Sequence, residues 1–374
     1  MLRIVWNLLL FVNCIPDGVF CRKFTTLQLV SKVVLEHSDI NIVVCPAAIE
    51  MALAQIYLGA GGETEAELKD VLSYPGKSKY QVMEAYRRAK NPQLKIISRL
   101  FLSSGFSILP AYQKMSKSYF NIDAESTDLS DQGVNKVNQW ITSKTKGEVV
   151  DLVDPFMMDD TAKVILVNAA SYEAFLKFNS AERNFYLPNE KRSVRVKMMD
   201  LLGNFKYNFQ SKLDSHIVAF PYGNSNLSMV MIVPRTFRGI GNLEDNLEHL
   251  DLQQLKLKRV NISLPKFKIK YDQDMAQPLV DVGVKSIFNH PNLTHLTKSK
   301  ETLKIDSIAH SASIEVNERR GRSSASEDSE LEILRSRRRR RSRAVFKVTC
   351  NRPFLFAVVQ GTKILFFGRF SRPE

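Results

Sequence analysis

The feature that most constrains the fold is a polar segment of about 25 residues, 319–343, which lies between two strand-like stretches. Its second half holds seven arginines in the nine residues from Arg335 to Arg343. A guanidinium group stays charged and needs water or acceptors, so this segment cannot be packed in a core and must be exposed. A long loop inside a compact domain is usually functional or disordered. Exposed Arg-Arg bonds are cleaved by trypsin-like and subtilisin-like proteases. The segment is therefore a protease bait, a processing tag or a grip for polyanions.

Charge restricts the partners of the chain. The 374 residues are 44% hydrophobic and carry a net charge of +14, and residues 319–343, with ten arginines and four acids, account for +6 of it. The remainder is also basic, which permits attraction to heparin-like chains or anionic surfaces. The sequence has neither a zinc-binding pattern nor a basic motif interleaved with aromatic residues. We therefore expect no nucleic-acid partner.

The first residues have the pattern of a signal peptide. Arg3 is followed by an apolar run from Ile4 to Val12, which is too short to span a bilayer. Cleavage after Cys14 or Cys21 fits the pattern of small residues at signal-peptide cleavage sites. The alternative is that these first residues form a buried helix. We predict a signal peptide over residues 1–21 and a mature domain over 22–374. No other segment resembles a membrane span, so we expect a secreted, extracellular protein.

The cysteines do not form a disulfide framework. Cys14, Cys21, Cys45 and Cys350 are the only four, and signal cleavage removes one or two of them. Cys45 and Cys350 end apolar runs, which favours free thiols in the core over a bridge.

Helical patterns come early in the chain and strand patterns late. The run Ala47–Leu58 is apolar on nearly every face and predicts a central buried helix that begins at Pro46. Thr64 and Glu67 form a capping-box pattern, and residues 134–151 form an amphipathic helix that ends near Gly147. This order favours an α+β fold over a doubly wound sheet. Strand-like runs cover residues 164–168, 194–198, 216–220, 227–233, 260–264, 312–316, 354–359 and 364–367.

Several short motifs occur in an order that is specific when taken together. Over residues 24–374 the chain resembles the serpin family of serine protease inhibitors. The motifs are Asn41–Ile49, Tyr57–Thr64, Asn138–Gly147, Leu166–Asn168, Val196–Met199, Pro221–Tyr222 with Asn226–Met229, Leu264–Lys268, His310 with Ile314–Glu318, Arg352–Phe356 and Phe367–Arg369.

The resemblance implies a fold of three β-sheets with eight or nine helices and an exposed reactive-centre loop at about 319–345. It also implies a mechanism in which a protease attacks the loop and forms an acyl-enzyme. The cleaved loop then inserts into the main sheet as a new strand, and the protease is distorted before it can deacylate. Such a protein is not an enzyme, and we expect no catalytic residue, cofactor or metal. His310 takes a structural position, and the expected state is a monomer.

The start of the loop departs from the inhibitory pattern of a glycine followed by small residues. Insertion places alternate side chains in apolar packing beneath the sheet. In an ungapped register Arg320 replaces the glycine and Glu327 later points inward. A shift of one residue restores Gly321, but it then turns Arg322 and later Asp328 inward. Either register buries charge after Glu318, which slows insertion and favours weak or lost inhibition.

The arginine run defines the expected cleavage site. Arg341-Ser342 is the best-placed scissile bond, and the bonds after Arg340 and Arg343 are close alternatives. Trypsin-like or furin-like serine proteases are the expected partners.

Two further sets of surface residues follow from the sequence. Heparin-like polyanions could bind the cluster Lys77, Lys79, Arg87, Arg88 and Lys90, which otherwise forms a solvated helix face. Sequons at Asn292, Asn261 and Asn226 are candidate glycosylation sites of a glycoprotein. The alternative function is a non-inhibitory extracellular binding or carrier protein that uses the arginine run for polyanions or processing.

Overall fold

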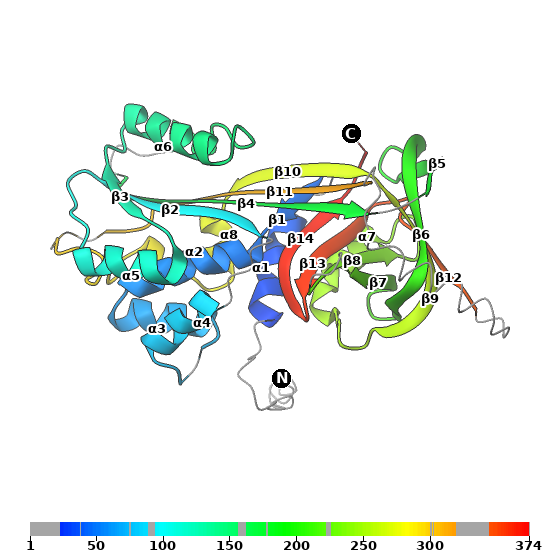
Figure 1. Ribbon diagram of the computed structural model, residues 1–374, viewed down its shortest axis with the longest axis horizontal. Coiled ribbons are helices and arrows are strands. Elements are labelled where there is room, and N and C mark those ends of the chain that lie inside the picture. Colours follow the sequence, from blue (N-terminus) through cyan, green and yellow to red (C-terminus); the bar gives the residue numbers. More distant parts are fainter. Residues whose placement is uncertain are drawn as a thin grey trace, which may run out of the picture.

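The computed structural model describes residues 23–374 apart from 38, 75, 89–93, 156–161, 177–178, 222–225, 300, 302, 319–343 and 374. This part of the chain forms eight α-helices and three sheets, as the α+β prediction and the family resemblance implied (Figure 1). The predicted signal peptide lies outside the described residues.

Sheet A is the five-stranded main sheet, in the order β10-β11-β4-β2-β3. One face packs on the body of the protein, and helix α6 lies across the other face, apart from the remaining helices (Figure 1). Val134, Val137 and Ile141 of α6 pack on Ile165 and Val167 of β4, as the amphipathic pattern predicted. The bounds are β2 Lys95–Ser103, β3 Ala124–Thr127, β4 Val164–Leu176, β10 Phe267–Asp274, β11 Ser307–Glu318 and α6 Asp131–Lys144.

The remaining nine strands form one hydrogen-bonded network that the long strand β6 divides into two sheets. Residues 192–200 of β6 pair with β5 and residues 198–207 pair with β9, and these strands make sheet C together with β12. The last residues of β6, 206–210, pair with β7, and sheet B continues through β8, β13, β14 and β1. The bounds are β1 Ile42–Val44, β5 Asn179–Leu187, β6 Arg192–Gln210, β7 Ser215–Pro221, β8 Leu227–Pro234, β9 Lys256–Pro265, β12 Phe346–Thr349, β13 Phe354–Gln360 and β14 Lys363–Phe370.

Helix α2 (Pro46–Gly59) is the predicted buried helix, with Pro46 as its first residue. The predicted capping box is wrong: α3 starts at Gly62, and Thr64 and Glu67 have other partners. The Thr64 hydroxyl accepts a hydrogen bond from the Asn292 amide, and the Glu67 carboxylate accepts from the amides of Lys285 and Ser286. The other helices are α1 Lys23–Glu36, α3 Gly62–Val71, α4 Lys79–Arg88, α5 Pro110–Phe120, α7 Ile240–Asp245 and α8 Ala276–Asp281.

Helix α6 ends earlier than the sequence pattern predicted. Its last residue is Lys144, and the chain then turns through Lys146 and Gly147, whose φ angles are +54° and +84°. This left-handed conformation favours glycine and stops the helix.

Both described cysteines, Cys45 and Cys350, are buried free thiols, as predicted. No helix within the described ranges is long and apolar enough to cross a membrane.

Candidate functional site

Both roots of the predicted reactive loop belong to regular strands. At its N-terminal root β11 ends at Glu318, whose backbone lies opposite Leu176, and at its C-terminal root β12 begins at Phe346. The predicted hinge residues Arg320, Gly321 and Arg322 lie outside the described residues. So do the predicted cleavage positions Arg340, Arg341, Ser342 and Arg343.

The N-terminal root continues a parallel pair of strands that we call the β4–β11 seam. It runs from the pair Ser307 and Ile165 to the pair Glu318 and Leu176, with the two strands directly bonded throughout. Any strand that enters sheet A at this point must therefore separate β4 from β11. The seam is where the insertion that the family resemblance implies would act.

The layer beneath the half of the seam that is nearer Glu318 is apolar and buried. It consists of alternate side chains from the two strands, each at most 4% exposed: Ala170, Tyr172, Ala174, Ala312, Ile314 and Val316. The Tyr172 ring also packs on Phe366 of β14, with 5.9 Å between the ring centres. A side chain that points inward from an inserted strand would enter this layer.

Further from Glu318 along the seam, a chain of hydrogen bonds joins both strands to the start of α2. The Cys45 amide donates to His310 Nε2 at 3.1 Å, so the ring proton sits on Nδ1 and faces Asn168 Oδ1 at 3.2 Å. Asn168 Nδ2 in turn donates to the Ala48 carbonyl at 2.7 Å. Burial lowers the pKa of His310 to about 3, so its ring is neutral at physiological pH. His310 therefore has the structural position that the sequence predicted.

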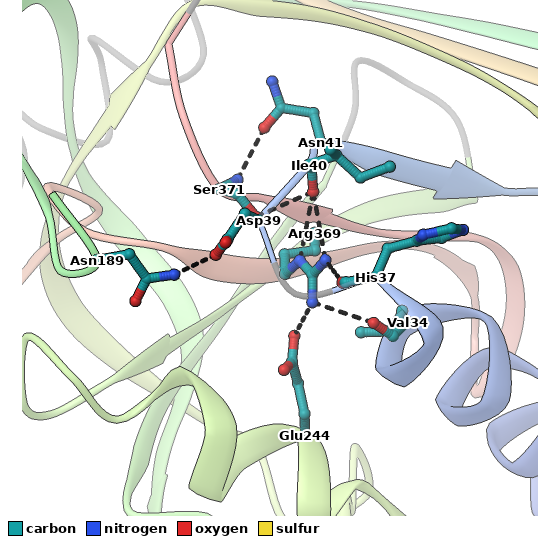
Figure 2. Close-up of polar contacts among 9 residues, drawn as sticks. All are labelled: Val34, His37, Asp39, Ile40, Asn41, Asn189, Glu244, Arg369 and Ser371. Atoms are coloured by element: carbon teal, nitrogen blue, oxygen red, sulfur yellow. Dashed lines mark hydrogen bonds and ion pairs between the residues drawn. The ribbon is translucent and has the colours of Figure 1, made fainter.

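The sequence did not reveal a buried ion pair beside sheet B. Arg369 of β14 is 1% exposed, and its guanidinium contacts Glu244 Oε1 of α7 at 2.7 Å (Figure 2). It also donates to the carbonyl of Val34 at 3.1 Å and to the carbonyls of His37 and Ile40. Burial raises the pKa of Glu244, and Arg369 counteracts that rise. The partners are far apart in sequence, so no local pattern announces the pair.

The predicted polyanion cluster is only partly available. Lys79 Nζ is held by Glu65 at 2.9 Å and by the Ala60 carbonyl at 2.6 Å. Arg87 and Arg88 share the carboxylate of Glu84 on the same helix. The pKa of Glu84 is lowered, chiefly by its hydrogen bond to Arg87. Lys77 lies before the helix over the Tyr74 ring, and Lys90 is outside the described residues.

The three sequons differ in accessibility. Asn226 and Asn292 are exposed, whereas Asn261 is half-buried within β9. The Thr294 hydroxyl donates to Asn292 Oδ1 at 2.8 Å, within the sequon itself.

Comparisons with known proteins agree with this architecture. A family model described as "Serpin (serine protease inhibitor)" matches residues 22–373. Serine protease inhibitor 42Dd of Drosophila melanogaster is 31% identical over 363 residues, which cover 92% of this chain and 94% of the relative. Serpin B6 of Macaca fascicularis is 27% identical over 89% of this chain and 93% of its own length.

Solved structures show the same fold. The structure of Serpin48, described as a highly specific serpin in the insect Tenebrio molitor, superimposes with a TM-score of 0.82 at 23% identity, over 94% of this chain and 97% of that one. Native protease nexin-1 with heparin gives a TM-score of 0.79 at 21% identity, over 94% and 98% of the two chains. With the family model matching nearly all of the chain and the sheet arrangement in agreement, the protein belongs to the serpin family of serine protease inhibitors.

Proposed function

We propose that this protein is a secreted serpin whose loop is cleaved after arginine by trypsin-like or furin-like serine proteases, and which traps them weakly or not at all. The observation that carries the proposal is the apolar layer beneath the β4–β11 seam. The arginine run supports the choice of protease, because Arg341-Ser342 and the neighbouring bonds offer arginine at the cleavage position.

The composition of the seam supports the expectation that trapping fails. A loop that doubles back after Glu318 first meets the level of Val316 and Ala174, and then that of Ile314 and Tyr172. These side chains provide no carboxylate to receive Arg322 in the shifted register, and no cation to receive Glu327 in the ungapped one. Burial of an unpaired charge costs several kcal/mol, which slows insertion relative to deacylation. A protease that deacylates first is released, and the serpin is consumed as a substrate.

The direct experiment is incubation with trypsin and with furin, followed by denaturing electrophoresis and mass mapping of the cut. We expect cleavage after Arg340, Arg341 or Arg343 without a covalent serpin–protease complex that survives SDS. Thermal unfolding of the cleaved protein should resemble that of the intact protein, since loop insertion would raise its melting temperature. A stable complex with either protease would contradict the proposal.

Two matched double variants test the hinge as the cause. Arg322→Ala/Asp328→Ala removes the inward charges of the shifted register, and Arg320→Gly/Glu327→Ala restores the glycine and removes the inward Glu327 of the ungapped register. Each removes one base and one acid, so net charge is the same in both. We expect one pair, and not the other, to gain complex formation and a more heat-stable cleaved form. If neither does, the hinge charges are not what limits inhibition.

Secretion and glycosylation belong to the same proposal. Expression of the full chain in animal cells should release protein that lacks residues 1–14 or 1–21, which N-terminal sequencing detects. Retention of Arg3 in the released protein would contradict the signal-peptide prediction. Enzymatic deglycosylation should shift its mass, and we expect Asn226 and Asn292 to be occupied because both are exposed.

Polyanion binding is a second candidate, supported by the net charge of +14 and by the Arg87–Arg88 end of α4. Salt-sensitive retention on immobilised heparin tests it. Arg87→Ala/Arg88→Ala should elute at lower salt, whereas Lys114→Ala/Lys117→Ala on neighbouring α5 serves as the matched control. Equal elution of the two variants would place the contact elsewhere.

A further inference from the structure

The outer face of sheet C, at the C-terminal root of the loop, is exposed and has no covering element among the described residues. Directly paired residues in a ladder point to the same face of a sheet, so the strand registers define this surface. Leu202 of β6 lies beside Asn261 of β9, which lies beside Lys347 of β12. The next rows pair Asn204 with Arg259 and Lys206 with Leu257.

The two faces of this part of sheet C are very different. On the inner face Val260 and Ile262 are completely buried, and the ring of Phe205 covers Gly203 so closely that a Cβ there would lie 2.5 Å from it. On the outer face Leu257 is 71% exposed and Leu202 is 47% exposed. Val345, two residues before Lys347, is 42% exposed. Three large aliphatic side chains are thus exposed around one end of the loop, a clustering that marks interaction surfaces.

This face is also positively charged. Lys206, Arg259 and Lys347 have no carboxylate partner in the described part of the chain. The nearest acid along these rows is Asp200, which is already paired with Arg183. A complementary partner therefore presents carboxylates together with apolar side chains.

The position of the loop identifies the occupant. Arg340 to Arg343 precede Val345 by two to five residues, and an extended chain spans at most about 3.5 Å per residue. A protease that holds any of these bonds in its active site is thereby brought close to Val345 and the start of β12, where the outer face of sheet C begins. Because β12 lies C-terminal to the cleaved bond, the part of the protease that faces the sheet is the rim of its leaving-group side.

We propose that the outer face of sheet C, formed by Leu202, Lys206, Leu257, Arg259, Val345 and Lys347, is a secondary docking surface for the protease that cleaves the loop. The matching surface of that protease is acidic and partly apolar and lies on the leaving-group side of its cleft. This inference rests on the proposed cleavage after arginine. It adds a determinant of protease choice outside the loop, since every trypsin-like enzyme accepts arginine but their rims differ in charge.

Anionic and cationic trypsin provide the probe, because they share a preference for arginine and lysine and differ in surface charge. The variant Lys206→Glu/Arg259→Glu leaves the loop sequence intact. We expect it to lower kcat/KM for loop cleavage by anionic trypsin roughly tenfold at low salt, an effect that 0.5 M salt removes. Cationic trypsin should be almost unaffected.

Two controls isolate the surface. Lys114→Glu/Lys136→Glu changes the net charge by the same amount at exposed positions on α5 and α6. Trypsin should cleave this variant at the wild-type rate. A synthetic peptide of residues 336–347 gives the ratio of kcat/KM for anionic over cationic trypsin on the loop sequence alone. We expect this ratio to be higher for the intact protein than for the peptide. Leu257→Asn should also slow cleavage by anionic trypsin.

The outcomes separate the two proposals. Cleavage after arginine at equal rates in wild type and Lys206→Glu/Arg259→Glu overturns the docking surface and leaves the proposed function intact. A glycan found at Asn261 on the secreted protein also overturns it, because the sugar would cover the centre of this face. Absence of cleavage after any arginine of the loop overturns both.

Discussion

Two enclosed regions of this protein offer opposite surroundings to an arginine side chain. Arg369 is completely enclosed, yet a carboxylate and three carbonyls receive its guanidinium. The layer beneath the β4–β11 seam is equally enclosed, but at the level where Arg322 would enter it contains aliphatic side chains and a tyrosine. The difference teaches that a buried arginine depends on a complete set of acceptors rather than on available space. On the proposed function, the residue type that stabilises one region would obstruct insertion at the other.

The test with the largest expected effect removes the one charged acceptor of Arg369. Glu244→Gln leaves a buried cation without its carboxylate, and we expect a loss of about 3–5 kcal/mol in the free energy of unfolding. Denaturant unfolding followed by circular dichroism measures it.

An exposed pair and a double replacement sharpen that result. Arg235→Met breaks an ion pair whose arginine side chain is 63% exposed, and should cost less than about 1 kcal/mol. The double variant Arg369→Met/Glu244→Leu should recover much of the loss, because it removes both charges. A Glu244→Gln protein as stable as the wild type would break the comparison.

A second test introduces charge at the seam without changing its sequence. His310 is neutral in the folded protein because burial lowers its pKa from 6.5 to about 3. The unfolded chain binds a proton below pH 6.5 and the folded chain does not, so stability is fully present above pH 6.5 and falls as the pH drops. From pH 6.5 to 5 this should cost about 2 kcal/mol.

His310→Gln is the matched control for that pH dependence. Glutamine retains one acceptor for the Cys45 amide and one donor for Asn168, and it does not titrate. Its unfolding free energy should fall less steeply with pH between 6.5 and 5, because the contribution of His310 to that slope is gone. An unchanged slope would assign the dependence to other groups.

Arg99 offers an intermediate case between the two regions. Its side chain is 18% exposed, bonds to Glu125 at 2.5 Å and lies 4.5 Å from the ring centre of Trp140 on α6. We expect Arg99→Ala to cost about 1 kcal/mol and to shift the emission of Trp140. Arg99→Lys keeps the charge but loses the planar stacking, so its stability should lie between those of the wild type and Arg99→Ala. Unchanged emission in Arg99→Ala would show that the stacking is absent in solution.

The smallest expected effect concerns the thiols near the seam. Cys45 and Cys350 are buried, and burial raises the pKa of Cys45 to about 12. A thiol reagent should leave both unmodified in the native protein and modify both after unfolding, as mapped by mass spectrometry. Rapid labelling of native Cys45 would mean that β4 and β11 separate readily, which would leave the burial of loop charge as the whole barrier to insertion.

Local patterns predicted those elements whose cause is local. Pro46 and the apolar run after it predicted α2, and the spacing of Val134, Val137 and Ile141 predicted the buried face of α6. The Thr64–Glu67 pattern failed because both side chains bind a segment more than 200 residues away. The ion pair of Arg369 was missed for the same reason.

The sites divide in a similar way. The order of motifs predicted the family and placed His310 at the seam, since each motif is a contiguous stretch. The exposed face of sheet C was missed, although the alternation of Leu202, Asn204 and Lys206 is a strand signal that could have revealed it. Gly203 obscured that signal, because a glycine inside a strand pattern usually suggests a bulge, whereas β6 continues through it.

The parallel direction of β4 and β11 has a consequence for the backbone. A strand that doubles back after Glu318 runs antiparallel to both neighbours, so one parallel ladder would be exchanged for two antiparallel ladders. Antiparallel ladders are slightly more stable per residue, and twice as many strand edges would be satisfied. The main chain of this protein thus favours the rearrangement that, on the proposed function, the charged side chains of the loop oppose. The proposal therefore implies that a few substitutions among those side chains would separate a protein consumed by proteases from one that captures them.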